Sequence, residues 1–432
     1  MNTAPSPGPV ATPLPELAPQ NHVDRRLTVS EYYHAAMGCH PQSHIRAHDV
    51  IIILEGIGTI DPTVWQAALN RTAEANPGAR LRLVGKRQKA RWISDGLPPQ
   101  LRIVDGCLWD GFSSEGTEAL FNTDLDLEAG RTAEVIIART RPEAREMKVI
   151  FRTSHAAMDG VGTLHIMYEM FRALRGEPLL GSNASYTDTD LMRNGPKRTA
   201  FKAQIEIADM MGGVQGEERG GIWRRITLSS PQPNLLPRIA AILTEYARRH
   251  SDKTARIGIP TNLRRHAPEL LTTMNFTGMT YLDMPPDITI DSNDIKSRLK
   301  DLRDGNADIN YRKIFEVMRY LPFAWVDGMV SINDKNYRSP NLHETAILSV
   351  LGTFKKTIFS GGGFAAESMY CVPQLENVFV AVSGLQGNFE ISIGMPRVFA
   401  SNGRLDDLLD LMLTRLDRSN SRVNADSDSA SD

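Results

Sequence analysis

Hydrophobic and polar residues follow two periods along this chain, one typical of strands and one typical of amphipathic helices. The Ile-rich run HDVIIILEG (48–56) predicts a strand, and a short helix over 28–37, with Ser30 as its cap, precedes it. DPTVWQAALNRTAEAN predicts a helix, because its apolar residues recur at helical spacing and Asp61 can cap it. ARLRLVG and ARWISDG predict a two-stranded meander, and AEVIIART and MKVIFRTSH predict another strand pair. An amphipathic helix then ends at Gly176.

The same kind of pattern returns after a polar segment, in which we place a linker at 186–200. Beyond it the sequence predicts a helix over 201–213, a strand (GIWRRITLS), a strong helix (NLLPRIAAILTEYARRH) and a strand (TARIGIPTNLR). Two helical segments between 292 and 330, the strand TAILSVLG, a hairpin turning at GLQGN and the helix RLDDLLDLMLTRLDR follow. FSGGGF (359–364) lacks the Lys–Ser/Thr pair of a phosphate loop and predicts a flexible loop. These patterns predict two α/β lobes joined by a crossover.

Composition and charge narrow the class of protein. The chain has 432 residues, 41% of them hydrophobic, which is enough for two domains. With 49 basic and 51 acidic residues, no global field favours nucleic acid or an anionic membrane. The Pro- and Ala-rich start lacks the basic and apolar regions of a secretory signal, and no apolar run is long enough to span a bilayer. We therefore expect a soluble, cytoplasmic protein with disordered tails at 1–22 and 420–432.

The motif FRTSHAAMDGVG is the strongest candidate for chemistry. His155 lies at the end of a predicted strand, and Asp159 and Gly160 form the turn into the next helix. An imidazole with a pKa near neutrality can take a proton from a nucleophile and return it. A histidine at a strand end is also a common structural residue, and Asp159 could simply cap the helix. The motif alone leaves both roles open.

The order of segments resembles the CoA-dependent acyltransferase superfamily, which includes chloramphenicol acetyltransferase and the condensation domains of non-ribosomal peptide synthetases. The H-x-x-x-D-G motif follows a strand and precedes a helix, as in that superfamily. GIPTNLRRHAPELLTTMNFTGM is similar to its DxR-like motif and asparagine–glycine turn, with Asn262 in place of the acidic residue. ILSVLG and AVSGLQGNFEIS resemble its closing strands, so that the resemblance covers residues 25–420.

The resemblance implies an α/β (α+β) fold of two chloramphenicol-acetyltransferase-like lobes with a substrate tunnel between them. The N-terminal lobe, with the motif, would span 23–185, and the C-terminal lobe would span 201–419. It also implies an acyltransferase that moves an acyl group from a pantetheine thioester to an amine or alcohol, in natural product biosynthesis. The donor would be acyl-CoA or a phosphopantetheinyl carrier protein, with no permanently bound cofactor. We expect a monomer acting on partners in trans.

The resemblance also assigns roles to individual residues. His155 would be the general base, and Asp159 would form a structural ion pair with Arg264. The backbone N–H near Gly160 would help to stabilise the oxyanion. The polar residues expected in the substrate pocket are Ser154, Asn275, Thr277 and Ser349.

Two departures from the family keep alternatives open. Condensation domains usually carry a second histidine just before the catalytic one, where this chain has Ser154, and the DFGWG motif of plant acyltransferases is absent. The alternatives are an acyl-CoA-dependent O-acyltransferase and a catalytically silent docking protein. With no G-x-S-x-G motif or cysteine nucleophile, a covalent acyl-enzyme is not expected.

No metal site is expected. The three cysteines are far apart and lack zinc-site spacing. Four histidines cluster within the N-terminal region, but their spacing is irregular and acidic partners are few. They predict a tunnel rim or a surface instead. They are His34, His40, His44 and His48.

Overall fold

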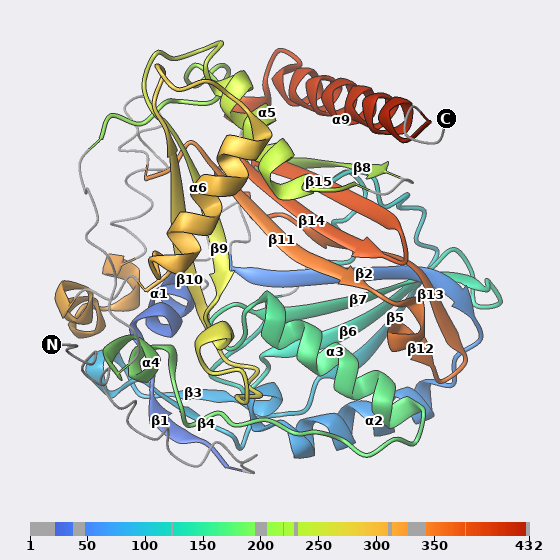
Figure 1. Cartoon of the computed structure of the whole chain (residues 1–432). Coiled ribbons are helices and arrows are strands. Elements are labelled where there is room, and N and C mark those ends of the chain that lie inside the picture. Colours follow the sequence, from blue (N-terminus) through green and yellow to red (C-terminus); the bar gives the residue numbers. More distant parts are fainter. Residues whose placement is uncertain are drawn as a thin grey trace, which may run out of the picture.

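Two six-stranded sheets form the framework of the computed structural model (Figure 1). The structure describes residues 22–37, 48–121, 124–194, 205–218, 220–228, 232–309, 313–326, 343–375 and 377–428. In the described residues, no helix is both long enough and apolar enough to cross a membrane.

The first sheet has the strand order β12-β13-β2-β7-β6-β5. Its strands are β2 (Asp49–Gly58), β5 (Gln100–Asp105), β6 (Ala133–Arg139), β7 (Glu146–Ser154), β12 (Ser360–Gly361) and β13 (Phe364–Val372). Helices α2 (Pro62–Ala75) and α3 (Gly160–Leu174) pack against each other over one face of this sheet (Figure 1). The predicted cap of α2 is confirmed, because the Asp61 side chain accepts a hydrogen bond from the N–H of Thr63 at 2.8 Å.

Smaller elements complete the first lobe. A three-stranded sheet contains the predicted meander, and the short helix α1 precedes β2. These elements are β1 (Asp24–Arg26), α1 (Val29–Met37), η1 (Pro77–Arg80), β3 (Arg82–Val84), η2 (Arg87–Lys89), β4 (Arg91–Ile93) and α4 (Asp188–Asn194).

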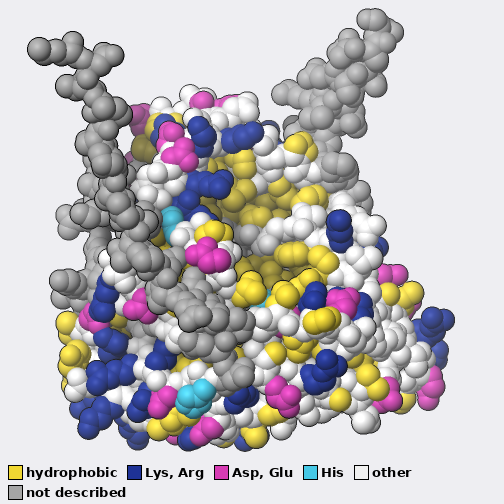
Figure 2. All heavy atoms as spheres, turned by 60° about the horizontal axis from the view of Figure 1, so that its bottom comes forward, with side chains coloured by type: hydrophobic (Ala, Val, Ile, Leu, Met, Phe, Trp, Pro, Cys, Tyr) yellow, Lys and Arg dark blue, Asp and Glu magenta, His cyan; other side chains and the backbone are white. Residues whose placement is uncertain are grey.

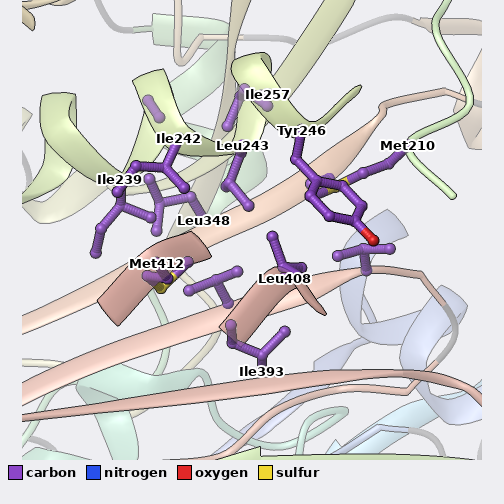
Figure 3. Packing of buried hydrophobic residues seen from close by; sticks show 14 of the residues in the cluster. Met210, Ile239, Ile242, Leu243, Tyr246, Ile257, Leu348, Ile393, Leu408 and Met412 are labelled. Atoms are coloured by element: carbon purple, nitrogen blue, oxygen red, sulfur yellow. The ribbon is translucent and has the colours of Figure 1, made fainter. Parts of the chain in front are cut away.

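The second sheet has the order β10-β9-β11-β14-β15-β8. Its strands are β8 (Gly221–Leu228), β9 (Ala255–Asn262), β10 (Thr277–Met284), β11 (Ala346–Phe354), β14 (Phe379–Leu385) and β15 (Asn388–Pro396). The helical segments of this lobe are α5 (Leu235–Ala247), η3 (Leu263–His266), α6 (Ser292–Asp304), η4 (Lys313–Tyr320), η5 (Lys356–Phe359), α8 (Arg397–Ala400) and α9 (Arg404–Asp428). Side chains of α5, α9 and one sheet face form a dry core (Figure 3), in which Ile239, Leu243, Leu348, Ile393 and Leu408 are fully buried. This packing leaves the other sheet face for the site.

A segment from the second half of the chain crosses into the first sheet. Strand β13 pairs antiparallel with β2, from Phe364 opposite Gly58 to Val372 opposite Ile51. The C-terminal lobe predicted at 201–419 is therefore wrong in one part, because its residues 360–372 belong to the first sheet. The flexible loop predicted at FSGGGF is wrong as well. That stretch is a tight β12–β13 turn, in which a Cβ at Gly363 would lie 1.9 Å from the backbone oxygen of Thr59. The close approach of two backbones, not flexibility, explains this glycine.

Other local predictions also differ from the structure. Residues 205–213 of the helix predicted over 201–213 are not helical, because Ile207 forms a parallel bridge with Thr254 and the chain turns at glycines. Residues 201–204 lie outside the described residues.

The predicted bounds of three segments also differ from those in the structure. Ser30 lies inside α1, and Thr28 caps the helix in a reciprocal capping box with Glu31. The predicted linker 186–200 contains helix α4. The last helix runs to Asp428, into the tail predicted at 420–432, because extending a formed helix costs far less than starting one. The tail at 1–22 lies outside the described residues except for its last residue.

One buried ion pair joins the two lobes. Asp159, at the start of α3, lies 2.9 Å from Arg264 of η3, and the predicted pairing of these residues is present. The carboxylate also accepts hydrogen bonds from the N–H groups of Gly162 and Phe276, at 2.7 and 2.8 Å, and from the Thr277 hydroxyl at 3.0 Å. Only 1% of Asp159 is exposed, so these donors replace the water that the charge has lost.

The guanidinium of Arg264 is equally well satisfied. It donates to the carbonyl oxygens of Thr272 and Met274 as well as to both oxygens of Asp159. Burial acts to raise the pKa of Asp159, but Arg264 and the backbone donors outweigh burial, so that this pKa is lowered. The carboxylate is therefore charged in the folded protein and fixes the loop between β9 and β10 against α3.

We predict that Asp159→Asn and Arg264→Ala each lower the free energy of unfolding at pH 7 by about 3–5 kcal/mol, because each leaves a buried polar partner unpaired. Since the folded-state pKa of Asp159 is lowered, its contribution is present above the unfolded pKa and is lost as the pH falls through the folded pKa. Urea unfolding of wild type and variants at pH 7 and near pH 3 would measure this, and the difference should shrink in acid.

The matched control is Arg82→Ala, which removes an exposed ion pair with Asp95 on the first lobe. This variant should unfold like the wild type, because exposed pairs contribute little. Asp159→Asn unfolding together with the control at pH 7 would contradict a structural role for the buried pair.

Candidate active site

The loop between β7 and α3 places His155 at the junction of the lobes. The N–H of His155 donates to the backbone oxygen of His48 at 2.7 Å, which fixes the main chain just after the strand. The side chain is half-buried and lines a cavity. A reactive group at the end of a strand and before a helix N-terminus is held by two rigid elements.

Asn275 orients the ring of His155. The amide Nδ2 donates to the backbone oxygen of His155 at 2.6 Å, so the amide oxygen faces the ring, 3.1 Å from Nδ1. Because this oxygen only accepts, the ring proton lies on Nδ1 and the lone pair lies on Nε2. Burial, followed by the charge on His48, lowers the pKa of His155 below its ordinary value of 6.5. The arrangement therefore presents a neutral imidazole with a basic Nε2.

The start of α3 lines the same cavity as His155. Gly160 and Val161 both line the cavity, and they belong to the first turn of a 15-residue helix. The N–H groups of a first helical turn have no intrahelical partner, and the helix dipole makes this end positive. A Cβ at Gly162 would lie 1.9 Å from the backbone oxygen of Thr273, so this glycine permits the close approach of the two lobes.

Two members of the predicted histidine cluster belong to the site. The ring of His34, on α1, stacks on that of His155 with centroids 3.9 Å apart and planes 10° apart. The Nδ1 atoms of His34 and His48 lie 2.8 Å apart. His40 and His44 lie outside the described residues. In the part of the chain that the structure describes, no group of three or more metal-ligating side chains could hold a metal ion.

A cavity of ≈ 670 Å³ opens between the lobes. The pairing register of the strands explains one wall of the cavity. On the sheet face that points away from the core of the second lobe, neighbouring strands present their side chains in pairs. These pairs are Thr277 with Asn262, Met279 with Pro260, Ile347 with Phe379, and Ser349 with Ala381. The opposite wall comes from the first sheet, where Ile51 of β2 and Val372 of β13 are register partners. Figure 2 shows a hollow lined by hydrophobic side chains on one face of the molecule.

The cavity is lined by both polar and apolar side chains. None of the described residues that line it is Lys or Arg. Asp49 lines the cavity but is paired with Arg152 at 2.6 Å, and burial raises the pKa of Asp49 despite this partner. Glu344 accepts a hydrogen bond from Asn377 at 3.0 Å. The walls thus favour apolar substrate groups.

The predicted pocket residues differ in whether they line the cavity. Asn275, Thr277 and Ser349 line the cavity, but the hydroxyl of Thr277 donates to Asp159. Ser154 does not line the cavity, so its prediction as a pocket residue is wrong. It is 6% exposed, and its Oγ accepts a hydrogen bond from the N–H of Ala156, which stiffens the loop.

Two partners of the His155 ring do not follow from the sequence. The sequence places His34 only in a histidine cluster at a tunnel rim or surface, whereas its ring stacks on His155. The sequence places Asn275 in the substrate pocket, whereas this side chain holds the ring of His155. The histidine cluster was the available signal for His34. Its position beside His155 depends on packing between segments far apart in the sequence.

Comparisons with known proteins identify the fold. The sequence matches no protein-family model and no curated protein. The first condensation domain of the CDA synthetase superposes with a TM-score of 0.64 at 14% identity, over 91% of this chain and 95% of that one. The condensation domain of the Monacolin K polyketide synthase gives 0.63 at 12% identity, over 92% and 97%. The epimerization domain of the third module of tyrocidine synthetase B gives 0.58 at 16%, over 93% and 98%.

At these identities the likeness bears on the fold. The matches extend over nearly the whole of each chain, so both lobes are included. The predicted two-lobed architecture is confirmed: this chain has the fold of the condensation domains.

Proposed function

We propose that this protein transfers an acyl group from a pantetheine thioester to an amine or alcohol, with His155 as the general base. The observation that carries the proposal is the ring of His155, which lines the inter-lobe cavity while Asn275 holds its Nδ1 and leaves Nε2 basic. The donor is acyl-CoA or an acyl carrier protein, and the product is an amide or an ester.

The proposed reaction is a single displacement at the thioester carbonyl. Nε2 of His155 takes the proton of the acceptor as the acceptor nitrogen or oxygen forms a bond to the carbonyl carbon. The C–S bond then breaks, and the leaving thiolate receives the proton from the imidazolium. Atoms and charges balance without a metal, an oxidant or a covalent acyl-enzyme.

The first turn of α3 supplies the electrostatic part of the proposal. The carbonyl oxygen becomes negative in the transition state, and preorganised N–H groups at a helix N-terminus stabilise such charge. Gly160 and Val161 line the cavity at this point, and the absence of a Cβ at Gly160 permits close approach. The Thr277 hydroxyl is directed at Asp159, so we assign it to the support of the loop.

The comparisons support the substrate class. One structure of the starter condensation domain of the rhizomide synthetase, with TM-score 0.58 and 13% identity, is a complex with C8-CoA and Leu-SNAC. We carry over to this chain the thioester donor and a small-molecule acceptor. The apolar walls of the cavity, from Ile51 and Val372 to Phe379, suit an apolar acyl chain. These points favour a role in natural product biosynthesis.

We predict that His155→Ala reduces acyl transfer by about 10²–10⁴-fold, the usual contribution of a general base. Mass spectrometry of the acylated acceptor would measure turnover with acyl-CoA and with acyl-loaded carrier protein as alternative donors. Thermal unfolding of the variant should resemble that of the wild type. Equal turnover by variant and wild type would exclude His155 as the base, whereas thioester binding without turnover by the wild type would indicate a silent docking protein.

We also predict the pH dependence of the reaction. The base is active when neutral, and burial together with the charge on His48 lowers the pKa of His155 below 6.5. The acid limb of the kcat/KM profile should therefore lie below the ordinary histidine pKa of 6.5. An acid limb above pH 6.5 would show that the base is not the half-buried, neutral imidazole described above.

A further inference from the structure

The ring of His155 is restrained from two directions. Asn275 holds the Nδ1 edge, and His34 covers one face of the ring with centroids only 3.9 Å apart. A hydrogen bond to one edge still allows the ring plane to tilt, whereas a parallel stack fixes that plane. The two contacts together leave Nε2 as the unrestrained edge.

His48 connects both of the other histidines. Its backbone oxygen accepts the N–H of His155 at 2.7 Å, and its Nδ1 lies 2.8 Å from Nδ1 of His34. One of these two nitrogens must donate and the other accept, because two protonated Nδ1 atoms would direct their hydrogens at each other. The His34–His48 bond therefore holds a single proton.

The backbone of His48 is unusual for a side chain of this size. Its φ is 75°, in the left-handed region that residues other than glycine rarely adopt. Such conformations persist where the surrounding contacts determine them, and they gather at functional sites. Tyr33 supports this geometry, because its ring meets those of His34 and His48 edge-on, at centroid distances of 5.3 and 5.6 Å.

We propose that His34 and His48 are positioning residues, which hold the ring of His155 in one plane and keep it neutral for its work as a base. The inference rests on the proposed function, because it assigns supporting roles around that base. Neither residue needs to touch the substrate to act in this way.

The acidic groups nearest the three histidines are already compensated. Asp49, next to His48 in sequence, is paired with Arg152, and Asp159 is paired with Arg264. The other titratable side chains around the cavity are Tyr33, Tyr281, His343, Glu344 and Cys371. Charge on His48 opposes protonation of His155, and burial together with charge on both neighbours lowers the pKa of His34 well below 6.5. A proton on one ring thus discourages a proton on the next.

The kinetic test compares variants that remove the stack or only its hydrogen bond. His34→Ala should lower kcat by about tenfold or more with KM within about twofold, because orientation of the base is lost while substrate contacts remain. His34→Phe keeps a flat ring over His155 and should lose clearly less. His34→Ala with the kcat and pH profile of the wild type would overturn the proposal.

His48→Asn separates charge from backbone geometry. Asparagine tolerates a left-handed φ and can still bond to Nδ1 of His34, but it cannot take up a proton. The pKa of His155, followed by NMR of the full chain without substrate, should rise in this variant, because the electrostatic effect of His48 acts to lower it. The acid limb of kcat/KM should move to higher pH by the same amount. The exposed His250→Asn serves as the matched control and should move neither.

The two readouts distinguish the failure of this inference from the failure of the proposed function. If the wild type transfers no acyl group, the NMR titration still decides whether His34 and His48 control the ring of His155. An unchanged His155 pKa in His48→Asn, with normal thermal unfolding, would overturn the inference even if acyl transfer is found.

Discussion

The buried carboxylate of Asp159 is the constraint on which the site depends. It comes from the first lobe, and most of its partners come from the second, namely Arg264, Phe276 and Thr277. A charge without water is tolerable only when its donors are in place, so any separation of the lobes at this point would expose an unpaired ion. The carboxylate therefore fixes the lobe spacing only four residues from His155. The cavity, the start of α3 and the ring of the base all take their positions from this contact.

Much of the fold could be predicted from the sequence because it is encoded locally. The period of β2, the cap of α2 at Asp61 and the β14–β15 hairpin depend on neighbouring residues. Strand β13 does not follow from the sequence, because FAAESMYCV carries no clear alternation of apolar and polar residues and its strand character comes from pairing with β2. Residues 205–213 of the helix predicted at 201–213 are not helical for the same kind of reason, since a long-range bridge from Ile207 overrides local preference.

The residues of the site likewise fall into those that the sequence predicts and those that it does not. The sequence predicts His155, Asp159 and Arg264 through a motif resemblance. A shared motif implies contacts between distant segments, which the period of hydrophobic residues does not. The motif does not include His34. The stack of His34 on His155 arises from the packing of α1 against the β7–α3 loop. Asn275 was placed in the pocket correctly, but its role could not be read from type alone, because an amide can serve a substrate or a side chain equally well.

The departure of this chain at Ser154 can now be given a physical meaning. A residue at this position points away from the cavity: Ser154 is buried, and its hydroxyl accepts the N–H of Ala156 inside the loop. The contacts that hold His155 come from His34 of α1, from His48 just before β2 and from Asn275 of the second lobe. Support supplied by three separate segments couples the orientation of the base to the closure of both lobes, because displacement of any one segment releases the ring.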